Sequence, residues 1–177
     1  MASFRIDPDR SQVWIEARSS LHPINSNTTG LEGTLDLDVG PDGRLDLTNE
    51  PSGHLELPVG RLSSGNDLYD REMHRRIDAR RYPTIKGDLG LLEAIDGDGR
   101  YKVRGDLTFH GVTHTYEHEM LITPVDDRTL KLEGENVFDV RDFNVTPPKL
   151  LMLKVHPDVA VRVSIVAERD VPEGEDR

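Results

Sequence analysis

Residues 100–122 read RYKVRGDLTFHGVTHTYEHEMLI, and this stretch decides the fold. Over 101–109, apolar or small residues stand at every second position, with charged or polar residues between them. Such a period of two residues is typical of a strand with one buried face. Gly111 marks a turn, and the alternation resumes after it. The stretch therefore predicts a β-hairpin with a very tight connection, and further strands must cover its apolar face.

Other parts of the chain repeat this alternation and supply those strands. The runs lie over 13–17, 31–39, 53–59, 85–91 and 159–167, with shorter apolar groups at 45–47, 130–132 and 137–140. Turn residues separate them, such as GPDG at 40–43 and GDG at 97–99. Residues 21–30 contain His-Pro and a series of Asn, Ser and Thr without periodicity, so we expect a loop there.

One segment has the period of a helix instead. Tyr69, Met73 and Ile77 recur every four residues within 66–79, and the Asn-Asp pair at the start of this segment can cap the first turn. Pro83 ends anything helical just before it. The sequence therefore predicts one short helix in a chain of strands.

Eight or more short alternating strands with one helix indicate an all-β protein. Because almost every strand keeps one uniformly apolar face, and because closure removes sheet edges, the pattern favours a closed antiparallel barrel. A two-sheet β-sandwich is the alternative. We expect residues 1–170 to form a single domain, and the charged tail at 171–177 to be disordered.

The composition argues against several classes of function. The formal net charge of −11 disfavours attraction to nucleic-acid phosphates, so nucleic acid is not expected as a partner. The chain has no cysteine, so neither disulfides nor thiolate chemistry is available. No apolar run has the length of a secretion signal or a membrane span, which leads us to expect a soluble, cytoplasmic protein.

Five motifs occur in a definite order: IDPDRSQV at 6–13, YPTI at 82–85, GDLTFHGVT at 105–113, RDFNV at 141–145 and the closing strand at 159–167. In kind and order they resemble the YceI-like family, also called polyisoprenoid-binding or lipocalin-like. The resemblance covers residues 3–168. It implies an eight-stranded, lipocalin-like barrel whose apolar interior holds a long isoprenoid or fatty chain. It also implies no enzymatic activity and no cofactor.

The chain departs from the usual pattern of this family at three places, one of which is RID at 76–78, where the family usually has Phe-Phe-Asp before Tyr-Pro. The helix contains YDREM at 69–73, where the family usually has Arg-Asp-x-His-Leu, and Gly87 stands where a phenylalanine is common. We expect Gly87 to leave room for a ligand. We also expect the inward-facing residues to contact that ligand; they include Ile15, Leu35, Leu57, Leu107, Phe109, Tyr116, His118, Met120, Val161 and Val163.

Three histidines of the opening stretch allow competing interpretations. His110, His114 and His118 recur every four residues, a spacing that would suggest a metal site on a helix. In a strand, residues four apart lie about 13 Å apart, so we predict no metal site. His118 falls on the apolar face and is interpreted as a core histidine with satisfied hydrogen bonds. The alternative function is an enzyme acting on an apolar substrate, with His118 as acid or base and Tyr116 beside it.

Two further segments suggest contacts with partners. Five arginines lie within 71–81, and Arg76 and Arg80, expected to be one helical turn apart, are predicted to bind a phosphate or carboxylate head group. The alternative is a solvated charged face. The apolar run LLML at 150–153 is expected to be a buried strand, or a loop at a barrel mouth or subunit interface. In a third interpretation, a ligand-free interaction domain forms a homodimer through residues 150–155.

Overall fold

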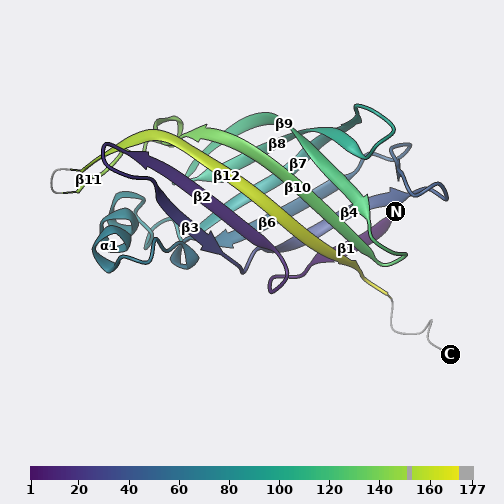
Figure 1. Ribbon diagram of the computed structural model, residues 1–177. Coiled ribbons are helices and arrows are strands. Elements are labelled where there is room, and N and C mark those ends of the chain that lie inside the picture. The colour runs from purple at the N-terminus through teal and green to yellow at the C-terminus, as the bar shows by residue number, and fades with distance from the viewer. Residues whose placement is uncertain (151–152, 172–177) are drawn as a thin grey trace.

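The computed structural model describes residues 1–150 and 153–171, which form an antiparallel β-barrel with a helix at one end (Figure 1). Eight strands of this described part make the ring: β1 (Ala2–Ile6), β4 (Glu32–Val39), β6 (Ser52–Pro58), β7 (Thr84–Ala94), β8 (Arg100–Phe109), β9 (Val112–Pro124), β10 (Thr129–Asp139) and β12 (Leu153–Arg169). Each strand pairs with the next, and β1 pairs with β12 to close the barrel. The predicted closed barrel is therefore confirmed, and the β-sandwich is wrong.

The long strand β12 shares one of its edges between two partners. Its C-terminal part pairs with β1, and its middle pairs with β2 (Gln12–Ser19). The other edge of β12 pairs with β10 over eleven residues of each strand. The β2–β3 hairpin therefore extends the wall beyond the closed ring, toward the helix (Figure 1).

The prediction of a loop over 21–30 is wrong for β3 (Ile24–Thr28), which pairs antiparallel with β2. Within the described residues β3 has no second strand partner, so it is an edge strand. The strand is only five residues long, and very short edge strands limit pairing with another chain. The strand forms through its contact with β2, which local composition does not reveal.

Several short elements complete the described chain. β5 (Leu45–Asp46) pairs with β4, and β11 (Lys149–Leu150) pairs with β12. Two 3₁₀ turns, η1 (Val59–Arg61) and η2 (Val140–Phe143), follow β6 and β10. The two strands expected at 130–132 and 137–140 form the single strand β10 as far as Asp139. Of the apolar run at 150–153, Leu151 and Met152 lie outside the described residues, as do residues 172–177 of the tail predicted at 171–177.

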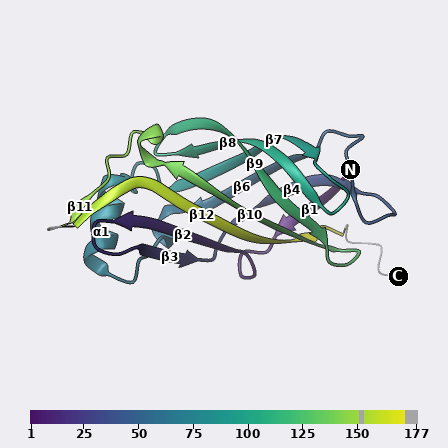
Figure 2. The same cartoon turned by 45° about the horizontal axis from the view of Figure 1, so that its top comes forward.

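The helix α1 (Asp67–Arg76) covers one end of the barrel (Figures 1 and 2). Its N-cap is Asn66, whose side-chain oxygen accepts hydrogen bonds from the backbone N–H groups of Leu68 and Tyr69. The helix ends three residues before the predicted end at 79. Asp78 has a left-handed backbone with φ of 48°, which a continuing helix cannot contain. No helix of the described chain is long and apolar enough to cross a membrane.

The barrel is filled with side chains at one end and hollow at the other. At the β1–β12 end, Ile6, Ala167 and Leu130 lie side by side on β1, β12 and β10, with exposed fractions of 2%, 0% and 1%. Toward α1, inward-facing residues such as Leu107 and Val161 are only partly buried. An eight-stranded barrel is just wide enough for its own side chains or one slender ligand. This barrel is filled by its own side chains at one end and leaves a cavity at the other.

Candidate functional site

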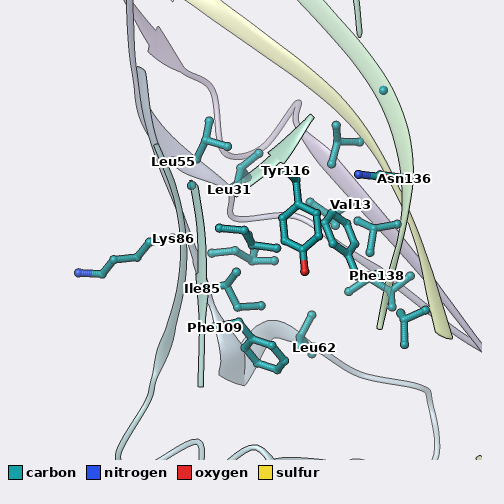
Figure 3. Close-up of a pocket in the computed structure, with 18 of the residues that line it drawn as sticks. Val13, Leu31, Leu55, Leu62, Ile85, Lys86, Phe109, Tyr116, Asn136 and Phe138 are labelled. Carbon is teal, nitrogen blue, oxygen red and sulfur yellow. The ribbon is translucent and has the colours of Figure 1, made fainter. Parts of the chain in front are cut away.

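The hollow part of the barrel is a cavity of about 450 Å³, and its lining is almost wholly apolar (Figure 3). All eleven residues predicted to face a ligand lie in its wall: Ile15, Leu35, Leu57, Gly87, Leu107, Phe109, Tyr116, His118, Met120, Val161 and Val163. They come from β2, β4, β6, β7, β8, β9 and β12. The structure thus brings these residues together around one space, and their contact with a ligand stays a prediction.

Glycines on the inner face help to create this space. Across neighbouring strands the register runs Leu35, Gly53, Leu89, Gly105 and Tyr116, so that each glycine lies between two large residues. At Gly53 the neighbouring side chain of Leu35 occupies the space that a side chain would take, since a Cβ there would lie 2.7 Å from Leu35 Cδ2. At Gly105 it is the backbone of β7 that comes close, because a Cβ there would lie 2.6 Å from the carbonyl oxygen of Asp88.

Gly87 faces the cavity as expected, but the side chain of Leu55 fills part of the space beside it. A Cβ atom at this position would lie 3.1 Å from Cδ1 of Leu55, its partner on β6. Leu55 itself lines the cavity (Figure 3). Leu55 was not among the residues predicted to face a ligand, although it stands on the same alternating face as Leu57.

Aromatic rings gather at the end of the cavity near η2. The Tyr116 and Phe138 rings meet edge to face with centroids 4.8 Å apart, and Phe109 and Phe143 lie 5.6 Å apart. The Tyr116 hydroxyl donates a weak hydrogen bond, 3.4 Å long, to Asp142. Burial, and then the nearby Asp142 carboxylate, raise the pKa of Tyr116. Tyr116 therefore keeps its proton and offers a neutral phenol to the cavity (Figure 3).

Two of the hairpin histidines hold η2 in place. The His110 Nδ1 lies 2.9 Å from the Phe143 carbonyl oxygen, and the His114 Nε2 lies 2.7 Å from that of Asp142. His110 and Gly111 both have positive φ, which gives the predicted tight two-residue turn between β8 and β9. These contacts assign a structural role to His110 and His114.

The third histidine, His118, lies in the cavity wall without a hydrogen-bond partner. Its Nδ1 is buried and unpaired within the described residues, so the interpretation as a satisfied core histidine is wrong. Burial is the cause that lowers the pKa of His118, because the charged imidazolium would be poorly solvated there. The side chain is therefore a neutral imidazole at pH 7.

The wall beside His118 is not fully hydrogen-bonded. The backbone pairing of β9 with β10 begins where Pro124 faces Leu130 and ends where Met120 faces Gly134. Both strands continue beyond that point, but within the described chain they are no longer paired. Beyond this point, the Asn136 Oδ1 accepts a hydrogen bond of 2.9 Å from the backbone N–H of Val137. Asn136 also lines the cavity. It was not predicted, because residues 130–132 and 137–140 were expected to be separate strands and the alternation between them was lost.

The helix forms the mouth of the cavity. Tyr69, Met73 and Ile77, which recur every four residues in the sequence, line it. Arg76 also lines it, and its Nε donates a hydrogen bond of 2.8 Å to Glu72. Hydrogen bonds from Arg75 and then Arg76 lower the pKa of Glu72 to about 2.

The predicted pairing of Arg76 with Arg80 is wrong in its geometry. Because α1 ends at Arg76, the two residues are not one helical turn apart. Arg80 is exposed and does not line the cavity. Of this pair, only Arg76 lines the cavity.

Comparison with known proteins identifies relatives of this barrel. The family described as YceI-like domain matches residues 4–167. Among solved structures, BcnA from Burkholderia cenocepacia superposes with a TM-score of 0.75 at 18% identity, covering 91% of this chain and 98% of that one. A polyisoprenoid binding domain from Saccharophagus degradans gives 0.77 at 13% identity, with 96% and 100% covered. The YceI protein of Campylobacter jejuni gives 0.64 at 16% identity, with 84% and 86% covered. No curated protein matches in sequence.

Proposed function

The chain belongs to the YceI-like domain family, and from this premise we propose that it binds one long apolar molecule, an isoprenoid or fatty chain, inside its barrel. The observation that carries the proposal is the cavity of about 450 Å³ with its almost wholly apolar lining. The structurally similar domain from Saccharophagus degradans is described as polyisoprenoid binding, which supports the same class of ligand. The protein would sequester or transport this ligand and release it chemically unchanged.

The energy of such binding would come mainly from the tail of the ligand. Each buried methylene contributes about 0.8 kcal/mol, so a chain of ten buried carbons supplies roughly 8 kcal/mol before the costs of association. A head group at the mouth would meet Arg76, which already bonds Glu72. An anionic head group would have to compete with Glu72 for this guanidinium. We therefore expect the tail to determine affinity and the mouth to contribute less.

Two variants on one strand test this proposal. Gly87→Phe places a ring in the cavity and forces the flexible end of Leu55 to move, because a Cβ at Gly87 lies 3.1 Å from it. The matched control is Lys86→Phe, which adds the same ring to the next residue of β7, whose side chain points away from the pocket (Figure 3). Native mass spectrometry and lipid extraction of the purified proteins measure the bound ligand.

We expect wild type and Lys86→Phe to carry an apolar ligand, and Gly87→Phe to carry less of it while remaining folded. Repeated recovery of an empty wild-type barrel, which also takes up no added isoprenoid or fatty chain, would refute the proposal. Equal ligand content in both variants would show that the ligand does not occupy this part of the cavity.

The structure favours neither of the other functions considered. Among the described residues, no protein group hydrogen-bonds to the buried Nδ1 of His118, so none holds the ring as the third member of a catalytic triad would. The segment proposed for a homodimer includes Leu151 and Met152, which lie outside the described residues. The enzyme and the ligand-free interaction domain therefore gain no support from the geometry.

A further inference from the structure

His118 contains the one buried side-chain nitrogen or oxygen without a hydrogen-bond partner in residues 1–150 and 153–171. An unpaired buried polar atom lowers stability, so proteins rarely keep one unless something else pairs with it. His118 stands on β9 opposite Val103 of β8, and its neighbours on the same face are Tyr116 and Met120. An aliphatic residue at this position would complete the apolar wall. The imidazole is therefore an unexplained polar group in a cavity built for an apolar molecule.

A second polar group faces the same cavity from β10. The Asn136 oxygen is occupied by the Val137 N–H, 2.9 Å away, and this bond fixes the orientation of the amide. The Asn136 nitrogen must then point the opposite way, and Figure 3 shows it directed into the pocket. Within the described chain this nitrogen donates to no protein acceptor.

The register of the strands brings these two groups to facing positions. Pairing of β9 with β10 ends at Met120–Gly134, and continuing the same register places His118 opposite Asn136 and Tyr116 opposite Phe138. The Tyr116 and Phe138 rings do meet, with centroids 4.8 Å apart, so the strands keep this alignment beyond their last backbone pair. His118 and Asn136 thus share the part of the wall where the two strands have separated.

We propose that His118 and Asn136 form a polar subsite that binds an uncharged, oxygen-bearing group, a hydroxyl or carbonyl, on the apolar ligand. The inference rests on the proposed function, because the ligand's chain must occupy the cavity. A hydroxyl oxygen can accept from the Asn136 amide and donate its proton to the unprotonated ring nitrogen of His118. A carbonyl oxygen can accept from the amide and from the protonated ring nitrogen.

The charges around the subsite argue against an anionic group there. The pKa of His118 is lowered, so the imidazole carries no positive charge to balance an anion. Arg76 stands on α1 at the mouth and is bonded to Glu72, and the Lys86 side chain points away from the pocket. An anion beside His118 would be buried without a partner, which is unfavourable.

Three probes with one C15 tail can test the subsite: farnesol, the hydrocarbon farnesene, and farnesyl phosphate. Each would displace the neutral dye N-phenyl-1-naphthylamine from the delipidated full-length protein. We expect farnesol to bind about tenfold more tightly than farnesene, the equivalent of one good hydrogen bond, and farnesyl phosphate to bind more weakly than farnesol. In His118→Leu this preference for farnesol over farnesene should disappear.

Met120→Leu is the matched control, since it changes shape on the same face of β9 without changing polarity. It should alter farnesol and farnesene binding alike. Where His118→Leu fails to fold, Asn136→Leu and the ¹⁵N chemical shift of His118 Nδ1 in the wild type take its place, and farnesol but not farnesene should move that signal.

The outcomes separate this inference from the proposed function. Equal binding of farnesol and farnesene by the wild type, or an unchanged preference in His118→Leu, would overturn the subsite and leave the carrier function standing. Tightest binding of farnesyl phosphate, insensitive to His118→Leu but lost in Arg76→Glu, would place the head group at the mouth and also overturn it. Failure of all three probes to enter the wild-type cavity would overturn both proposals.

Discussion

Gly33 is the residue whose replacement the backbone tolerates least. Its φ is +148°, and a Cβ atom there would lie 1.9 Å from the carbonyl oxygen of His54 on β6. Gly33→Ala should therefore destabilise the protein by about 3 kcal/mol, because backbone atoms of β4 and β6 must move apart. Denaturant unfolding followed by circular dichroism measures this loss. Gly60→Ala is the control, since nothing lies within 4 Å of its Cβ position, and we expect less than about 0.5 kcal/mol there. Similar losses for the two variants would contradict the close approach at Gly33.

His54 on the outer face should make stability depend on pH. Its Nδ1 lies 2.6 Å from Asp88 and its Nε2 3.0 Å from Glu56, and hydrogen bonds to Asp88 and then Glu56 raise its pKa. Only the protonated ring can donate to both carboxylates at once. Because the pKa is higher in the folded than in the unfolded state, the stabilisation is fully present below about pH 6.5 and is lost as the pH rises through the folded-state pKa.

We therefore expect the wild type to exceed His54→Gln in melting temperature at about pH 6, and this advantage to shrink by about pH 9. The effect should be small and should decrease with added salt, because the side chain is 43% exposed. In Asp88→Asn the pH dependence should weaken, since the larger of the two contacts is lost. A difference between wild type and His54→Gln that stays constant with pH would count against this pairing.

At single positions, the sequence predicts the direction of a side chain much better than its partners. The inward placement of Leu107, Tyr116 and Met120 follows from the two-residue period of a strand, which is a local property. The unpaired state of His118 depends on where the β9–β10 pairing stops, and the leaning of Leu55 over Gly87 depends on the register between β6 and β7. Both are non-local, so a single sequence without its pairing cannot reveal them.

Among the elements, α1 has its first turn fixed by the Asn66 cap and by Asp70, whose carboxylate accepts hydrogen bonds from Ser63 and Ser64. The helix has no buried residue between Asp67 and Arg76. The hydrogen bonds of Asn66 to the first turn should therefore contribute a large share of its local stability. Asn66→Ala should cost about 1 kcal/mol of local stability, which corresponds to roughly fivefold more frequent opening of the helix.

Trypsin can report this opening, because α1 contains Arg71, Arg75 and Arg76. We expect initial cleavage within the helix to be about fivefold faster in Asn66→Ala than in the wild type under native conditions. Ser52→Ala, on the exposed part of β6, should leave the rate unchanged. Equal cleavage rates in Asn66→Ala and the wild type would show that packing against the barrel, and not the cap, holds the helix.

The elements that the sequence predicted well are those that carry their own signal. The alternation over 31–39 and 100–122 predicted β4, β8 and β9 because each strand buries one face. β3 has a polar sequence, and only its pairing with β2 makes it a strand. The end of α1 also depended on a single backbone conformation, at Asp78, which neither periodicity nor Pro83 indicates.

Over the whole molecule, the two ends of the barrel should differ in their protection from hydrogen exchange. The tight turn at His110–Gly111 makes Phe109–Val112 a hydrogen-bonded pair, so alternate residues of β9, including Tyr116 and His118, bond to β8. Thr115 and Glu117 then point their N–H groups toward β10, where no pairing is described beyond Met120–Gly134. We expect these two amides to exchange at least about tenfold faster than those of Tyr116 and His118.

Nuclear magnetic resonance of the exchanging amides makes this comparison residue by residue. The β1–β12 end provides the internal reference, because Ile6 and Ala167 lie in a paired and almost fully buried region. Uniform protection along β9 would mean that the two strands come together in solution over their full length.

The pairing of inner glycines with large neighbours has a consequence for how this family diverges. A Cβ at Gly53 would lie 2.7 Å from Leu35 Cδ2, and one at Gly134 would lie 3.0 Å from Met120 Cγ. Bulk can therefore be exchanged between the two members of each pair, but it cannot simply be added to one of them. In an alignment of homologues, these positions should covary, with a larger residue at the glycine accompanied by a smaller one on the adjacent strand. The summed side-chain volume of the two residues would then be conserved, although neither position would be conserved by itself.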